Sequence, residues 1–179
     1  MRGERRVTHV DPNLATLEQT IRSTTEGFSP QQLSWHPTGK WSAAEVLEHL
    51  YLTYTGTIKG FERVAAAGKS LATQSTLKHR AGILLVIKLG YLPSGRQAPA
   101  LARPKGVPAE KVMAEILSAI ASMDAIISNC EQKFGRSEKL LDHPILGPLS
   151  APEWKKFHLV HGLHHAKQIR RLRQAAQAS

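Results

Sequence analysis

The sequence predicts an all-α protein, a four-helix bundle with one long crossover. Four stretches carry apolar residues three or four positions apart, which is typical of the buried face of an α-helix. Two Ser-x-x-Glu capping boxes mark helix starts, and no stretch has the convincing apolar/polar alternation of a half-buried strand. With 179 residues, 41% of them hydrophobic, the chain fits a single domain over residues 1–179.

The first helix is predicted to begin at Asp11, whose side chain can cap a helix that has Pro12 in its first turn. Leu14, Leu17 and Ile21 then recur at helical spacing. Prolines and a glycine in the following stretch predict a loop, because proline disfavours helical geometry in the residue before it.

The second helix is predicted from about Ser42 to the Ala-Ala-Gly at 66–68. Ser42 and Glu45 form a capping box, and Trp41 and Val46 flank it as a hydrophobic staple. An apolar stripe continues along the helix at Val46, Leu50, Tyr54, Ile58 and Phe61.

The stretch from 68 to 107 is predicted to be the long crossover, with a short helix over 83–89 followed by a loop rich in Pro, Gly and Arg. The third helix is predicted from near Pro108 to Gly135. Its apolar positions step by three or four residues, at Val112, Ile116, Ile120, Met123 and Ile127.

The fourth helix is predicted to follow a loop that contains His143-Pro144 and Gly147-Pro148. Ser150 and Glu153 form its capping box. At 100° per residue, one face collects Trp154, His158, His161, His165, Ile169 and Leu172. The basic residues are expected on the other faces, at Lys155, Lys156, Lys167, Arg170, Arg171 and Arg173.

The composition favours a cytoplasmic protein without a membrane span. A single cysteine, Cys130, cannot form an internal disulfide and is expected to be a packed core thiol. The basic start at 1–6 is not followed by the apolar stretch of a secretory signal, and the apolar run at 83–87 is too short to cross a bilayer. The net charge of +10 can attract phosphates, anionic lipids or acidic substrates, but the cations are scattered along the sequence, which argues against a nucleic-acid role.

Two histidines point to a metal site. His161 and His165 lie four residues apart, so on a helix they project from one face and can chelate a single cation. Neutral imidazole suits zinc, nickel, iron or copper, and His49 is the best candidate for a third ligand. Three protein ligands would leave a coordination position open, as in catalytic zinc sites. Histidines at this spacing also occur as ordinary polar residues of a helix.

Other side chains are weaker candidates. His158 is a candidate for a group behind the ligands, a proton shuttle or a half-buried helix residue, and His164 for a surface or packing residue near the rim. Arg96, Arg103 and Lys105 can bind an anionic substrate or a thiol cofactor at the mouth of the site, or simply be solvated.

The general base of a hydrolase is not identified by the sequence. No glutamate lies between His161 and His165, which excludes the His-Glu-x-x-His arrangement of metalloproteases. Glu45 has a capping role, and both Glu45 and Glu48 are expected to project away from the neighbours of His49.

Two motifs resemble the metal-ligand motifs of the DinB-like superfamily. The first is Trp-Ser-Ala-Ala-Glu-Val-Leu-Glu-His-Leu at 41–50, and the second is His-Gly-Leu-His-His-Ala-Lys-Gln-Ile at 161–169. The segment His-Pro-Ile-Leu-Gly-Pro-Leu-Ser-Ala-Pro-Glu-Trp at 143–154 resembles a subgroup of that superfamily with no assigned biochemical role.

This resemblance implies a four-helix bundle, often a homodimer, that holds one divalent metal through His49, His161 and His165. Nickel or zinc is the common metal, with iron, manganese or cobalt as alternatives. Gln168 also fits the family pattern, and its amide can support a ligand or only pack on the helix. Some relatives are transferases or isomerases that use a low-molecular-weight thiol, others resemble metal-dependent hydrolases, and many have no known reaction.

Three functions follow as hypotheses. The first is a metal-dependent enzyme, a thiol-dependent transferase or a hydrolase, acting on a small-molecule substrate. The second is a non-catalytic metal-binding stress-response module, in which the ion ties two helices together. The third is a metal-free basic bundle that binds nucleic acid or a protein.

Overall fold

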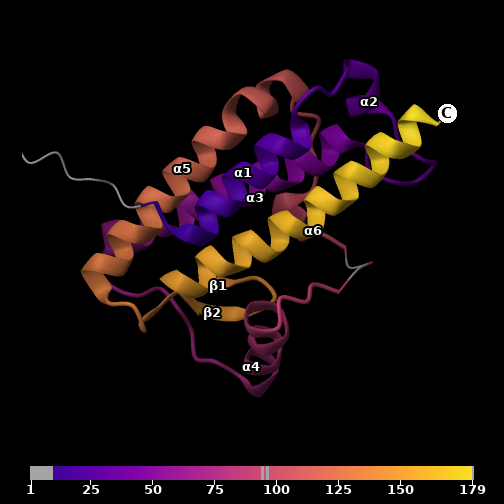
Figure 1. Ribbon diagram of the computed structural model, residues 1–179. Coiled ribbons are helices and arrows are strands. Elements are labelled where there is room, and N and C mark those ends of the chain that lie inside the picture. Colours follow the sequence, from indigo (N-terminus) through magenta and orange to yellow (C-terminus); the bar gives the residue numbers. More distant parts are fainter. Residues whose placement is uncertain (1–9, 94, 96, 179) are drawn as a thin grey trace, which may run out of the picture.

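A computed structural model describes residues 10–93, 95 and 97–178 of the chain (Figure 1). Its elements in chain order are α1 (Pro12–Thr25), α2 (Pro30–Ser34), α3 (Ala43–Ala67), α4 (Leu77–Ile83), a π-helical turn (Leu84–Lys88), a 3-10 turn (Ala100–Ala102), α5 (Ala109–Phe134), β1 (Lys139–His143), β2 (Gly147–Ser150) and α6 (Ala151–Gln177). The predicted all-helical class is therefore confirmed for most of the chain, with one short hairpin as the exception.

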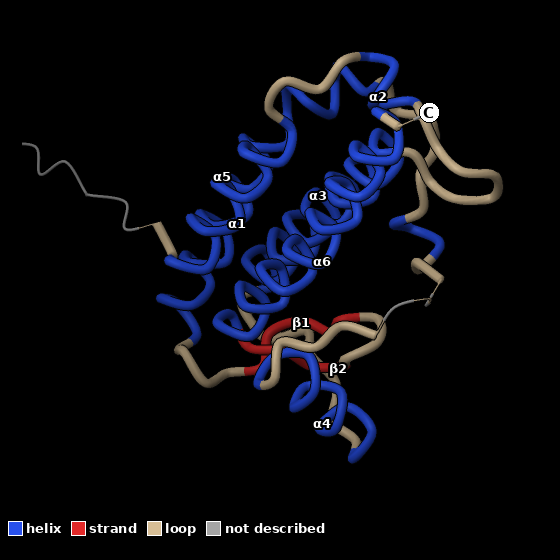
Figure 2. Tube along the Cα trace, turned by 45° about the vertical axis from the view of Figure 1, so that its right-hand side comes forward, coloured by secondary structure: helices blue, strands red, loops and turns tan. Residues whose placement is uncertain are grey.

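The four longest helices pack against one another. α3 contacts α5 and α6, and α1 lies against α6 and α5, as the two views of the chain show (Figures 1 and 2). The core between them is made of fully buried side chains such as Leu17, Leu50, Tyr54, Ile120 and Ile169. α4 and the hairpin lie together at one end of this helical core (Figure 2).

The predicted starts of the long helices are confirmed. The Asp11 side chain caps α1 by accepting from the Asn13 backbone N–H. Ser42 and Glu45 form the capping box of α3, which ends before Gly68 in the left-handed conformation at φ 66°. The Ser150 box of α6 is present as well.

The predicted loop between the third and fourth long helices is wrong in part, because 139–150 contains an antiparallel hairpin. β1 and β2 pair with a shift between Lys139 and Leu141. The strands have only five and four residues, and Pro148 lies in the second. Such short strands carry no readable alternation, and their pairing gives no local signal.

The short helix predicted over 83–89 begins earlier than expected. Thr76 caps α4, and His79 occupies the third position of its capping box, where glutamate or glutamine is the usual residue. The predicted range corresponds instead to the end of α4 and the π-helical turn. The start of α4 was missed because its cap lacks the usual acidic partner.

The prediction that Lys155 lies off the buried face is wrong. Its residue is only 4% exposed, and its ammonium group lies between Glu131 of α5 and Asp11 at the start of α1. α6 packs against α1 and α5 as well as α3, so more than one of its faces is covered.

α5 is, within the described part of the chain, the one helix long and apolar enough to cross a membrane by length and composition. It packs along α3 and buries Ile116, Ile120 and Ile127. The core helix of a soluble protein passes the same test, and α5 occupies that position here.

Candidate metal centre

His49 lies in the second turn of α3 and faces α6. Its residue is 4% exposed, and its Nδ1–H donates to the Ala102 carbonyl oxygen at 2.7 Å. A carbonyl can only accept, so Nδ1 carries the proton of the neutral ring. The Nε2 lone pair of His49 is therefore free on the side that faces α6.

His165 is held in the same way from α6. Its Nδ1 lies 2.9 Å from the Gln168 side-chain oxygen, one turn later on the helix. This contact is the support that the sequence suggested for Gln168, and it leaves Nε2 of His165 as an acceptor. His161, one turn before His165, is 7% exposed.

The three Nε2 atoms converge. The His161 Nε2 lies 3.1 Å from that of His49 and 3.1 Å from that of His165, and the three ligand atoms all lie within 4.8 Å of one another. The structure thus brings together the three predicted ligands, from α3 and α6.

Protons alone do not satisfy this cluster. With Nδ1–H on His49 and His165, the only proton available between the three Nε2 atoms is that of His161, and one proton cannot serve both neighbours. A cation bound by nitrogen at about 2.0–2.1 Å would accept all three lone pairs at once. Among the described residues, the three histidines form the group that can hold a metal ion.

Burial keeps the cluster neutral. Desolvation lowers the pKa of His49, although the Ala102 hydrogen bond opposes it. Desolvation and the neighbouring His49 lower the pKa of His165 to about 3, and the pKa of His161 lies well below its usual value for the same kind of reasons. Neutral imidazoles have lone pairs available at neutral pH, as metal ligands require.

Glu48 makes a contact with the crossover that the sequence did not predict. The residue is 2% exposed, and its carboxylate accepts the backbone N–H groups of Lys105 at 2.6 Å and Gly106 at 3.1 Å. This pairing ties the crossover to α3 a few residues after Ala102, the partner of His49. Sequence reasoning missed the role of Glu48, although a glutamate beside a candidate ligand on a helix was a usable signal.

His158 is not part of the cluster. It is fully buried, with Nε2 3.1 Å from the Thr57 hydroxyl and its ring stacked on Trp154. Desolvation lowers its pKa to about 3. Of the roles considered for it, that of a buried helix residue fits these contacts.

Cys130 is a packed core thiol, as expected. The residue is 1% exposed, and its sulfur lies 3.7 Å from the Phe61 carbonyl oxygen. Burial raises its pKa, which disfavours the nucleophilic thiolate.

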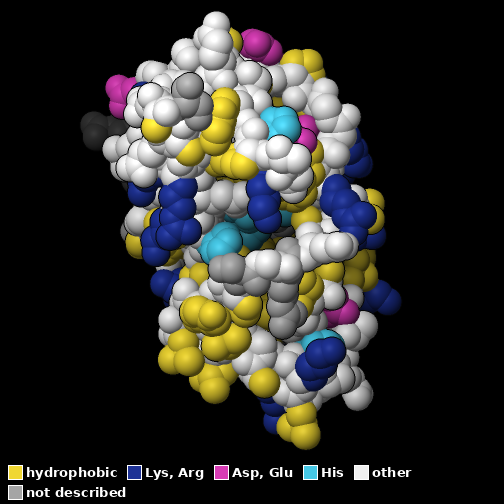
Figure 3. All heavy atoms as spheres, turned by 90° about the vertical axis from the view of Figure 1, so that its right-hand side faces the viewer, with side chains coloured by type: hydrophobic (Ala, Val, Ile, Leu, Met, Phe, Trp, Pro, Cys, Tyr) yellow, Lys and Arg dark blue, Asp and Glu magenta, His cyan; other side chains and the backbone are white. Residues whose placement is uncertain are grey.

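A cavity of about 840 Å³ opens beside the cluster and is lined by all three histidines and by His164. Figure 3 shows histidine side chains at the bottom of a hollow with Lys and Arg side chains around its mouth. Arg103 and Lys105 are not among the lining residues, and the Arg103 guanidinium instead donates to Ala98 and Gln97 of the crossover. Arg96 lies outside the described residues.

These features define a mostly helical protein with a buried cluster of three histidines that can hold a metal ion beside an open cavity. A family model described as "Protein of unknown function (DUF1569)" matches residues 17–172, so the chain belongs to this family. No curated protein and no solved structure matches the chain.

Proposed function

We propose that this chain binds one divalent metal ion through His49, His161 and His165 and is a metal-dependent enzyme of DinB-like type. One observation carries the proposal: the three Nε2 atoms face one another, while His49 and His165 turn Nδ1 toward Ala102 and Gln168. Polar partners that fix the far nitrogen of each ring are typical of histidine ligands in metal sites.

The cavity favours chemistry over a closed structural site. Three protein ligands leave room for a further ligand, and the cluster borders a cavity large enough for a small-molecule substrate. When bound, the cation would supply Lewis acidity that lowers the pKa of a coordinated water or low-molecular-weight thiol. His49 and His165 would orient the site through their Nδ1–H groups, while Glu48 holds the crossover over it.

The resemblance of the two histidine motifs to those of the DinB-like superfamily supports further parts of the proposal. It favours nickel or zinc as the metal, a transferase or hydrolase reaction, and four long helices arranged as a four-helix bundle that pairs as a homodimer. The single cysteine, Cys130, supports a cytoplasmic setting.

Metal analysis of the purified protein tests the proposal. We expect about one equivalent of a divalent metal in the wild type, and its loss in His161→Ala and His165→Ala. His36→Ala is the control, because His36 is exposed, lies outside the cluster and pairs with the adjacent Pro37 carbonyl oxygen. Metal content that is unchanged in the two cluster variants, or a wild type that binds no divalent metal, would contradict the proposal.

A second candidate is a non-catalytic site in which the ion joins helices. It is favoured by the origin of the ligands, one from α3 and two from α6. Cobalt-substituted protein separates the two candidates: an enzyme with an open position should change its visible spectrum when azide is added. An unchanged spectrum would favour the structural role.

A further inference from the structure

The cavity beside the histidines is elongated along α3. The lining residues of this helix recur three or four positions apart and run from His49 to Arg63. At about 1.5 Å of rise per residue they span about 21 Å. The cavity therefore extends well beyond the space that a metal ion and its water would fill.

The opposite walls of this cavity are mainly apolar. They come from the α4 region, the crossover, the hairpin and α6, and include Leu85, Leu92, Leu141, Leu146 and Phe157. The charged lining residues are Arg63, Lys78 and Asp142, whose carboxylate accepts the Thr73 backbone N–H. An ionised ligand would lose its hydration against such walls, so they favour a neutral, lipophilic molecule.

One polar group on these walls has a fixed role. The backbone N–H groups of Ile145 and Leu146 both donate to His143 Nδ1, each at 3.1 Å. Nδ1 is therefore an acceptor, and the proton of the neutral ring lies on Nε2. Burial lowers the pKa of His143 to about 4, so the ring stays in this form at neutral pH.

The Nε2–H of His143 is available to a ligand. In the described part of the chain it has no hydrogen-bond partner, and His143 lines the cavity. The Phe157 ring lies next to both His143 and His161, with centroid distances of 4.3 Å and 5.2 Å. The Nε2–H of His143 is therefore a fixed donor, and the Phe157 ring lies between it and His161 of the histidine cluster.

Gly56 leaves space at the centre of the α3 wall. It lies midway along the lining stripe, and a Cβ added there would meet no atom within 4 Å. A glycine inside a helix costs about 1 kcal/mol relative to alanine. The position keeps the cavity open where a side chain would fill it.

We propose that this cavity binds a neutral lipophilic carbonyl compound, with its apolar chain along α3 over Gly56 and its carbonyl oxygen accepting the Nε2–H of His143. The compound would be the substrate class of the metal-dependent enzyme, and to that extent the inference rests on the proposed function. Binding itself needs only the apolar walls and His143, so it can be tested without the metal.

Displacement of the neutral dye Nile red by methyl ketones of increasing chain length tests the apolar part. We expect affinity to rise about fourfold per methylene in the wild type. Gly56→Phe should fold normally by circular dichroism, because its Cβ meets no atom, yet lose this dependence. Glu62→Phe, on the exposed side of α3, should keep it. Equal chain-length dependence in Gly56→Phe and the wild type would overturn the proposal.

The variant His143→Asn tests the carbonyl contact. Its side-chain oxygen can still accept the turn amides, as asparagine does in turns, but its amide group is too short to replace Nε2–H in the cavity. We expect affinity for a ketone to fall about two- to tenfold, and affinity for an alkene of equal length to stay unchanged. A ketone-to-alkene ratio that does not change would overturn the assignment of His143.

Removal of the metal with a chelator separates this inference from the proposed function, because it leaves the residues that line the cavity unchanged. If the untreated wild type holds metal and the chelated protein binds ketones with the same chain-length dependence, both proposals are supported. If the wild type holds metal but shows no chain-length dependence, the lipophilic ligand is wrong and the metal site stands. If the wild type holds no metal while ketones still bind, the proposed function fails and the cavity assignment stands.

Discussion

Two clusters of buried polar side chains lie on α6, and they are completed in different ways. Near the start of the helix, Lys155 faces α1 and α5 and meets carboxylates. Further along, His161 and His165 face His49 of α3, and the Nε2 atoms of the three rings lie against one another. The first cluster is closed within the protein, and the second presents lone pairs to a common point.

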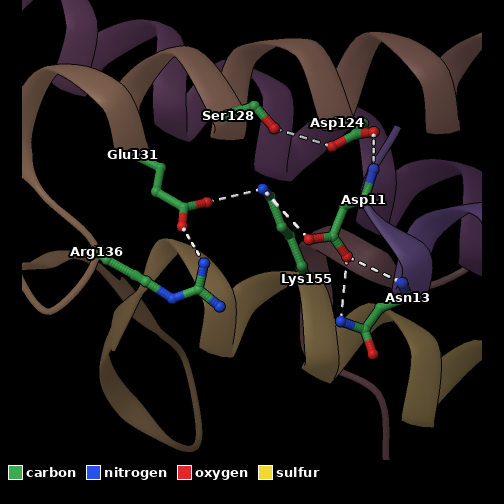
Figure 4. A network of polar contacts seen from close by, with 7 residues as sticks. All are labelled: Asp11, Asn13, Asp124, Ser128, Glu131, Arg136 and Lys155. Atoms are coloured by element: carbon green, nitrogen blue, oxygen red, sulfur yellow. Dashed lines mark hydrogen bonds and ion pairs between the residues drawn. The ribbon is translucent and has the colours of Figure 1, made fainter. Parts of the chain in front are cut away.

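The Lys155 cluster pairs its polar groups within the protein (Figure 4). The ammonium group lies 2.8 Å from Glu131 and 3.5 Å from Asp11. The Asp11 backbone N–H donates to Asp124, which also accepts from the Ser128 hydroxyl. Opposite charges and donors are thus paired without any added group, as a structural network requires.

The histidine cluster contains facing lone pairs and also a buried polar atom without a hydrogen-bond partner. The Nδ1 atom of His161 is buried with no partner in the described structure. A buried polar atom without a partner costs stability, and such exceptions to satisfaction call for an explanation. Thr24, Tyr54 and His158 also have a buried polar atom without a partner, so the unpartnered atom alone does not set the histidine cluster apart. The facing Nε2 atoms are what distinguish it from the Lys155 cluster, and they support the proposed metal site.

The largest effect is expected when the Lys155 cluster loses its ammonium group. Lys155→Met should lower the free energy of unfolding by about 3 kcal/mol, because two carboxylates lose their buried counter-charge. Urea unfolding followed by circular dichroism measures it. Lys156→Met is the matched control, since Lys156 has no ion pair among the described residues. A similar small loss in both variants would show that the Lys155 network is not a stabilising one.

The second largest effect is expected when a metal ion binds the histidine cluster. Zinc or nickel at roughly a hundredfold excess over its dissociation constant should raise the free energy of unfolding by about 2.7 kcal/mol. His161→Ala should not respond to the metal, whereas Lys155→Met should respond as fully as the wild type. Thermal unfolding with metal and with chelator measures both. A response that survives in His161→Ala would place the metal elsewhere.

The difference between the clusters also shows which structural features can be predicted from sequence. The bounds of α3, the start of α6 and the shared face of His161 and His165 follow from caps and spacing, which are local. The burial of Lys155 depends on a carboxylate 144 positions earlier in the chain, at Asp11, so no pattern within α6 predicts it. The contact of Glu48 with the backbone near 105 is long-range in the same way.

A third prediction uses pH to probe the buried histidines outside the cluster. His158 has a pKa of about 3 in the folded protein, against about 6.5 for an ordinary histidine, because burial disfavours its charged form. At pH values between these two, His158 is protonated in the unfolded chain and stays neutral in the folded protein. The free energy of unfolding should therefore fall as pH drops below about 6.5, by up to about 1.4 kcal/mol per unit for this residue.

Urea unfolding in chelator at a series of pH values measures this slope. The matched variant is His158→Gln, whose amide can keep the Thr57 hydrogen bond but does not titrate. The free energy of unfolding of this variant should fall less steeply with decreasing pH than that of the wild type, by the contribution of the one proton that His158 binds on unfolding. If His158→Gln and the wild type lose stability equally steeply, the acid sensitivity comes from other groups.

The smallest predicted effect comes from two glycine-to-alanine substitutions that should change the free energy of unfolding in opposite directions. Gly162, beside His161, faces α1, and an added Cβ there would run into the Leu17 side chain, so Gly162→Ala should destabilise the protein. Gly56 faces the cavity, and Gly56→Ala should raise the free energy of unfolding by up to about 1 kcal/mol through helix propensity alone. Thermal unfolding of the two variants measures both changes. The same substitution is thus compared on two helices. If Gly56→Ala also lowers the stability, the space beside Gly56 is filled in the folded protein.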